Sequence, residues 1–248
     1  MGPALRRLVC ILLAAAAWTW PILPGVAGDG SKPGSPEFQR FQQSFFEDPS
    51  SARDGLDEAA LAALRDSERA AAEEMLIAIL PDARGVIGLG TLRSKKAAPA
   101  LQKLFDKEHQ AWRAALRARD LDTTPNKLTY IAKTLWLIAP HRSYLDALAA
   151  VLSVADFAMQ RHSAAEAFAV FRDPAAVPAL AAALDDPDEL VRYAAAQSLL
   201  AIHGFRHDPG PDPQHMNFRV MNADPAIRLA AKQEILSAIA GESIAPME

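Results

Sequence analysis

The sequence from Asp173 to Gly204 most restricts the fold, because it carries the complete signature of one helical hairpin. Asp173 followed by Pro174 is typical of a helix start, since aspartate caps the first turn and proline has no N–H to leave unpaired. Apolar residues then recur at helical spacing until the Asp-Asp-Pro segment at 185–187 predicts a turn. A second apolar periodicity follows and ends at Gly204, a residue type favoured at helix C-termini.

Copies of this hairpin precede and follow it. Large apolar residues occupy one equivalent position of five second helices: Leu89, Leu135, Phe168, Leu199 and Ile235. The position one turn earlier holds small residues in all but the second copy: Gly85, Ile131, Ala164, Ala195 and Ala231. Consecutive copies lie 46, 33, 31 and 36 residues apart. Repeats at such spacings indicate stacked supersecondary units, so we predict an all-α fold, an α-solenoid of four to five helical hairpins.

With these repeats the chain resembles HEAT-repeat proteins, in particular the short bacterial HEAT-like repeats also seen in phycobilin lyase subunits. The motif that carries the resemblance is an Asp in the turn and an Arg six residues later. Asp186 and Arg192 match it, and Asn222 and Arg228 match it with Asn in place of Asp. The resemblance implies that such pairs form a ladder along the array. It also predicts a turn-to-helix ion pair between Asp186 and Arg192.

The N-terminal residues are predicted to be a secretion signal. Arg6 and Arg7 precede a 13-residue apolar run, Leu8 to Trp20, which is short for a membrane span. Small residues at positions 25 and 27 suit a signal peptidase, so we expect cleavage after Ala27. A retained N-terminal anchor is the alternative.

The mature chain expected after cleavage contains no cysteine, because the one cysteine, Cys10, lies in the signal. Removing Arg6 and Arg7 from the 26 basic residues leaves 24 against 30 acidic ones, a net charge of −6. A mildly acidic chain lacks the basic footprint that nucleic acids require. We therefore expect a periplasmic or secreted protein that binds a protein partner, with no nucleic acid, no cofactor and no integral span after signal removal.

Composition divides the chain into five segments. They are a signal peptide at 1–27, a flexible leader at 28–36, an N-terminal helical cap and first helices at 37–80, the repeat array at 81–240 and a frayed tail at 241–248. The cap carries phenylalanines at helical spacing: Phe38, Phe41, Phe45 and Phe46. They either cover the apolar end of the stack, as solenoids require, or form a docking peptide for a partner groove. We favour the first interpretation.

Candidate binding residues lie on the second helices and on one extended helix: Lys133, Arg161, Arg192, Arg228 and Trp112. The cations are expected on a concave face lined by the second helices, where an array of this kind leaves a long surface free. Trp112 belongs to the segment 106–127, which lengthens one repeat. It either packs locally or projects as an anchor for a partner.

The sequence contains weaker candidates for a metal-binding or catalytic site. Imidazoles and carboxylates gather near one proline-rich loop: His203, His207, His215, Asp208 and Asp212. They are candidate ligands of a metal-binding protein or metal-dependent enzyme, but no zinc motif is met and we favour a loop of turn-forming residues as the explanation. No catalytic motif such as GxSxG is present, so we predict that the protein is not an enzyme. An immunity or inhibitor protein is a further alternative.

Overall fold

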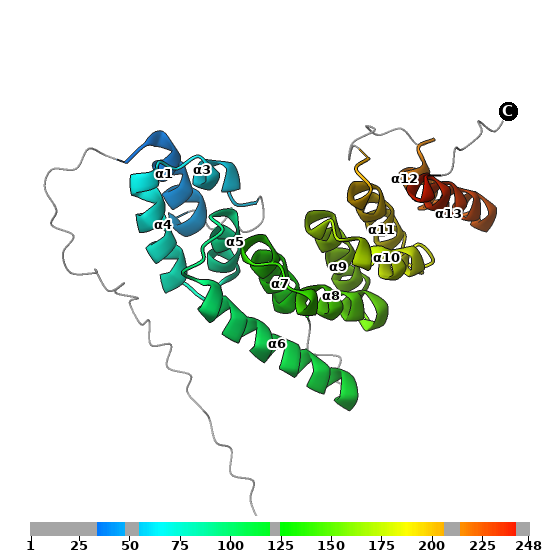
Figure 1. Ribbon diagram of the computed structural model, residues 1–248, viewed down its shortest axis with the longest axis horizontal. Helices are drawn as coiled ribbons and strands as arrows, with labels where there is room; N and C mark the ends of the chain where they lie inside the picture. Colours follow the sequence, from blue (N-terminus) through cyan, green and yellow to red (C-terminus); the bar gives the residue numbers. More distant parts are fainter. Residues whose placement is uncertain (1–33, 48–54, 120–124, 206–213, 242–248) are drawn as a thin grey trace, which may run out of the picture. The chain divides into compact units, whose positions relative to one another are not determined.

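The computed structural model describes residues 34–47, 55–119, 125–205 and 214–241, and within these ranges all regular structure is helical (Figure 1). The elements below belong to one compact unit, Ser35–Glu248. The predicted signal peptide lies outside the described residues, as do most of the leader and of the tail.

Five helical hairpins follow one another in the described ranges. Their first helices are α4 (Asp66–Ala78), α6 (Ala98–Ala118), α8 (Arg142–Val154), α10 (Val177–Ala183, after a 3-10 turn at Pro174–Ala176) and α12 (Met216–Arg219). Their second helices are α5 (Ala83–Thr91), α7 (Asn126–Ile138), α9 (Ala158–Phe171), α11 (Glu189–Ile202) and α13 (Pro225–Ala240). Consecutive second helices pack side by side from α5 to α13 (Figure 1). The predicted all-α solenoid of four to five hairpins is confirmed.

The repeat positions read from the sequence form the buried seam between the hairpins. The large apolar position is at most 1% exposed in every copy: Leu89, Leu135, Phe168, Leu199 and Ile235. The residues one turn earlier are buried as well, including Gly85 and Ala195. Because each second helix contacts the next through these side chains, the seam joins the hairpins into one continuous core.

Glycines on α5 allow it to approach α4 closely. A Cβ atom at Gly85 would lie 2.8 Å from the backbone oxygen of Leu76, and one at Gly88 would lie 2.7 Å from a methyl carbon of the same leucine. These separations are shorter than real carbon contacts, so larger residues would push the two helices apart. The glycine-rich segment at 85–90 is therefore a tightly packed helix.

Two short elements precede the first hairpin: α1 (Pro36–Gln42), which continues as a π-helical turn at Gln43–Glu47, and α3 (Glu58–Ala62). Phe41 and Phe45 are fully buried, with ring centroids 5.1 Å apart. The backbone oxygen of Phe45 accepts a hydrogen bond of 3.0 Å from Arg84 on α5. The aromatic segment thus packs onto the first hairpin, as a cap does. That hairpin begins at Asp66, so the expected array boundary at residue 81 falls inside it.

The long helix α6 accounts for the extended second repeat. Trp112 is only 4% exposed and Leu116 is half-buried. The indole is therefore a local packing residue, and the expectation of a projecting tryptophan anchor is corrected. The physical reason is that α6 lies against α7, which covers the apolar side of the helix and leaves Arg113 and Arg117 exposed.

Candidate functional site

Three arginines near the starts of α9, α11 and α13 make the same pair of contacts. In each, Nη1 donates to the backbone oxygens of the residues six and five positions earlier, which lie in the preceding turn. The pairs of distances are 2.8 and 3.0 Å from Arg161 to Ala155 and Asp156, 2.7 and 3.0 Å from Arg192 to Asp186 and Pro187, and 2.9 and 2.7 Å from Arg228 to Asn222 and Ala223. We call Arg161, Arg192 and Arg228 the turn-binding arginines.

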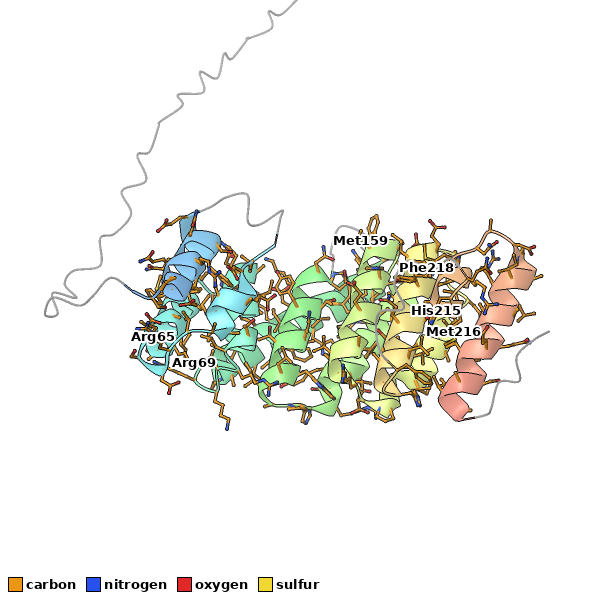
Figure 2. All side chains as sticks on the ribbon, turned by 90° about the horizontal axis from the view of Figure 1, so that it is seen from above. Arg65, Arg69, Met159, His215, Met216 and Phe218 are labelled. Carbon is orange, nitrogen blue, oxygen red and sulfur yellow. The ribbon has the colours of Figure 1, made fainter. Side chains whose placement is uncertain are left out.

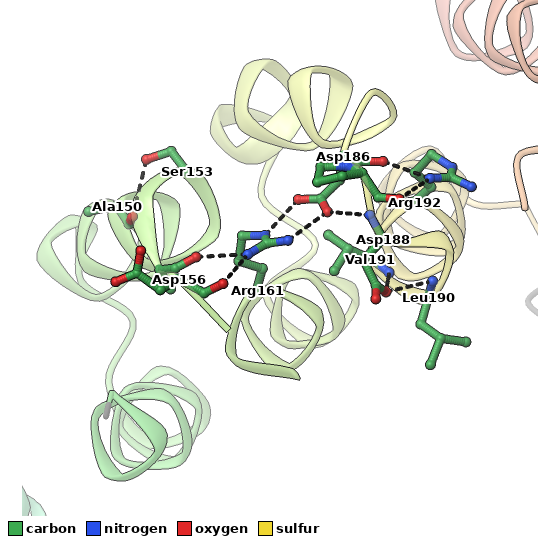
Figure 3. A network of polar contacts seen from close by, with 11 residues as sticks. Ala150, Ser153, Asp156, Arg161, Asp186, Asp188, Leu190, Val191 and Arg192 are labelled. Atoms are coloured by element: carbon green, nitrogen blue, oxygen red, sulfur yellow. Dashed lines mark hydrogen bonds and ion pairs between the residues drawn. The ribbon is translucent and has the colours of Figure 1, made fainter. Parts of the chain in front are cut away.

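The first of these arginines also binds the next hairpin. Arg161 Nε donates to Asp186 Oδ2 at 2.7 Å, and Nη2 donates to Oδ1 at 2.9 Å (Figure 3). Both side chains are largely buried, 12% and 8% exposed. The hydrogen bonds to Asp186 raise the pKa of the Arg161 guanidinium. This bidentate pair fixes the start of α9 to the turn before α11.

The prediction of an ion pair between Asp186 and Arg192 is wrong, because the two residues are in contact through a backbone oxygen and not through the carboxylate. Arg192 contacts the backbone oxygen of Asp186, while the carboxylate of Asp186 turns to Arg161 of the preceding hairpin. The Asp186 Oδ1 atom also accepts from the backbone N–H of Asp188 at 2.9 Å, which holds the carboxylate in that orientation. The two residues six positions apart, Asp186 and Arg192, thus form a backbone contact within one hairpin. The ladder contact, between Arg161 and Asp186, joins two hairpins.

Arg192 differs from Arg161 because it lacks a carboxylate partner among the described residues. Its side chain is buried, with the residue 7% exposed, and Nε donates to the backbone oxygen of Val220 at 2.7 Å. Burial, and secondarily the positive charge of Arg228, lowers the pKa of the Arg192 guanidinium. The charges of Glu189, Asp186 and Asp188 act in the opposite direction, but none of these carboxylates is in hydrogen-bond contact with the guanidinium.

Asn222 explains the difference, because it takes the place that Asp186 holds in the preceding turn. Its Oδ1 atom accepts from the backbone N–H of Asp224 at 2.8 Å, the same turn contact that Asp186 makes with Asp188. The rest of an amide side chain is an NH₂ group, which is a donor and cannot accept from a guanidinium. The ladder contact is therefore missing between α11 and α13.

A pocket of about 530 Å³ lies at this interface. Its lining includes the two guanidiniums, a third cation and apolar side chains: Arg192, Arg228, Lys232, Leu184, Pro187 and Leu229. Lys232 is paired with the carboxylate of Asp185.

Large apolar side chains are exposed along the edge where the second helices begin. Six of them, each between 37% and 65% exposed, form what we call the apolar edge: Val154, Phe157, Met159, Leu190, Ile227 and Leu229. Met159 and Leu190 occupy equivalent positions, each five residues before the small residue of its helix. Met159 lies at the rim of the stack in Figure 2. Phe205, also exposed, follows the opposite end of α11.

Sequence reasoning did not identify the apolar edge. Its signal was available, because these residues fall outside the buried repeat positions: Val154 ends α8, Phe157 caps α9, and the other four lie in the first two turns of α9, α11 and α13. Of the predicted binding residues, Lys133 is exposed on α7, remote in sequence from the turn-binding arginines. The structure therefore brings Arg192 and Arg228 to one pocket and leaves Lys133 apart from their turns.

The histidine candidates are only partly described. His203 is the C-terminal cap of α11, and His215 Nδ1 accepts from the backbone N–H of Asn217 at the start of α12, at 3.4 Å. His207, Asp208 and Asp212 lie outside the described residues. Within the described ranges, no group of three or more His, Cys, Asp or Glu side chains is arranged to hold a metal ion.

Comparison with known proteins identifies the repeats. The family of HEAT repeats matches residues 122–210, which include α7 to α11. The protein carries HEAT repeats. Helices α4 to α6 and α13 extend this HEAT array by packing onto its two ends. No curated protein matches the chain. In the part of the chain that the structure describes, none of the helices has the length and apolar character needed to cross a bilayer.

Proposed function

We propose that this HEAT-repeat protein is an exported scaffold that binds a protein partner, without catalysis, through the exposed side of its second helices. The observation that carries the proposal is the apolar edge. Isolated exposed leucines are ordinary on protein surfaces, but exposed large apolar side chains that recur on consecutive elements are typical of interaction sites. Met159, Leu190 and Leu229 come from three consecutive second helices.

The charges around the edge indicate the chemistry of its partner. Exposed carboxylates flank the apolar residues in each turn: Asp156, Glu189 and Asp224. Interfaces commonly combine an apolar centre with a charged rim of complementary sign. The edge therefore suits a protein segment with apolar anchors and basic residues around them. HEAT arrays are suited to such binding because stacking leaves an extended face uncovered.

The test uses paired substitutions of matched chemistry. Met159→Asp with Leu190→Asp places two charges on the edge, whereas Phe205→Asp places one on an exposed apolar residue at the other end of α11. Capture of the partner from an envelope extract should fall about tenfold or more for the edge variant only. Thermal unfolding should be unchanged for both variants. Equal capture by the edge variant and the Phe205→Asp variant would refute the proposed surface.

Export is tested separately. Arg6, Arg7 and the apolar run that follows them support secretion, and the small residues at 25 and 27 support cleavage. The protein isolated from its native host should begin at Gly28 or Asp29, which intact-mass measurement and N-terminal sequencing would detect. Recovery of the full-length chain from the cytoplasm would contradict export.

A further inference from the structure

We infer that the pocket between the turn before α11 and helix α13 binds a carboxylate of the partner, with Arg192 and Arg228 as its ligands. The inference rests on the proposed scaffold function and adds the chemical class of one group that the partner presents. Two successive interfaces of the same array differ in their polar contacts: the one between α9 and α11 and the one between α11 and α13.

At the preceding interface, between α9 and α11, the turn-binding arginine has a carboxylate partner, which the pocket between α11 and α13 does not provide for Arg192. There Arg161 holds two turn carbonyls with Nη1 and a carboxylate with Nε and Nη2. Arg192 holds the equivalent two carbonyls, but its Nε donates to the backbone oxygen of Val220, and no described residue accepts from its Nη2. Among the described residues, the Nη2 group of Arg192 therefore has no acceptor, whereas Arg161 uses the same group to bind a carboxylate one repeat earlier.

Arg228 adds a second set of hydrogen-bond donors to the same pocket. Its Nη1 is occupied by the turn carbonyls of Asn222 and Ala223, while Nε and Nη2 have no acceptor among the described residues. Both arginines line the pocket, and the charge of Arg228 contributes to lowering the pKa of Arg192. Two guanidiniums that line one pocket repel each other. A carboxylate between them would offset that repulsion and accept charge-assisted hydrogen bonds from both.

The acidic side chains of the pocket do not fill this role. Asp186 is committed to Arg161, and Asp185 to Lys232. Glu189 is exposed, and no ion pair of it is found among the described residues. With Asp186 paired to Arg161 outside the lining, three cations (Arg192, Arg228 and Lys232) face two carboxylates (Asp185 and Glu189), an excess of one positive charge that favours an incoming anion.

The apolar residues that line the pocket indicate which anion it binds: an acidic side chain of a protein, next to an apolar side chain. Pro187 and Leu229 line the pocket next to the guanidiniums. Leu229 also belongs to the apolar edge, so one partner segment could occupy both surfaces. A small inorganic anion would leave these apolar side chains uncovered, whereas a Leu-Glu sequence would bury them and supply the carboxylate.

The experiment measures binding of acetyl-Leu-Glu-amide to the full chain, followed by the NMR signal of Arg192 Nε–H. We expect a saturable shift with this peptide and none with acetyl-Leu-Gln-amide, which has the same shape without the charge. Asn222→Asp restores, at the equivalent turn position, the carboxylate that Asp186 provides one repeat earlier, and it keeps the turn contact with Asp224. We expect this variant to weaken peptide binding about tenfold or more and to raise the melting temperature.

Arg228→Gln is the second variant, and it should also weaken peptide binding without disturbing the buried Arg192. Equal shifts with the Glu and Gln peptides, or full binding by the Asn222→Asp variant, would overturn the assignment. Peptide binding that appears only after residues 242–248 are removed would assign the pocket to the chain's own acidic tail and also overturn it. Because the measurement needs no partner, its failure is distinguishable from failure of the edge experiment.

Discussion

An aspartate in place of Leu199 is expected to abolish the cooperative thermal unfolding of the array. Leu199 is 0% exposed and lies in the C-terminal half of α11, which packs between α9 and α13. The substitution removes a buried leucine and puts an unpaired carboxylate into the seam. The free energy of unfolding should fall by about 4 kcal/mol or more, because cavity formation and charge burial add. Circular dichroism at the helical band, followed during heating, measures the loss.

Leu190→Asp is the matched control for this experiment. It introduces the same charge into the same helix, but Leu190 is 45% exposed at the apolar edge. Its effect on the free energy of unfolding should stay within about 0.5 kcal/mol. A Leu199→Asp variant that melts like the Leu190→Asp variant would show that the seam does not pass through position 199.

Replacing Arg161 by methionine is expected to cost about 3 kcal/mol of the free energy of unfolding. Methionine keeps much of the side-chain volume but leaves the largely buried carboxylate of Asp186 without its bidentate partner. It also leaves the backbone oxygens of Ala155 and Asp156 without their donor. Chemical denaturation of the purified variant, at constant ionic strength, measures the change.

Arg228→Met serves as the comparison, because Arg228 makes the same two backbone contacts without a carboxylate. Both of its backbone hydrogen bonds are exposed to solvent, so the loss should be about 1 kcal/mol. The difference between the two variants isolates the contribution of the ion pair between hairpins. Equal losses would mean that the turn carbonyls, and not Asp186, account for the stability that Arg161 provides.

The helices, and the side of each helix that is buried, follow from local signals in the sequence. Asp173, Asp188 and Asp224 each cap the helix start that follows, and these contacts lie within three residues of the cap. The apolar positions of the second helices are also readable locally, because a 3.6-residue period shows which side of a helix must leave water. Because that pattern recurs five times along the chain, it also indicates the stack of hairpins.

The partners of the polar side chains, in contrast, depend on how the hairpins pack together. Asp186 lies six residues from Arg192 and 25 from Arg161, yet its carboxylate binds the more distant one. Spacing along the chain reveals which groups are within reach, but the choice depends on how the next hairpin packs. The same holds for Trp112, which a neighbouring helix covers, and for Met159 and Leu190, which no neighbour covers. Burial at these positions is a property of adjacent repeats, and a single helix does not encode it.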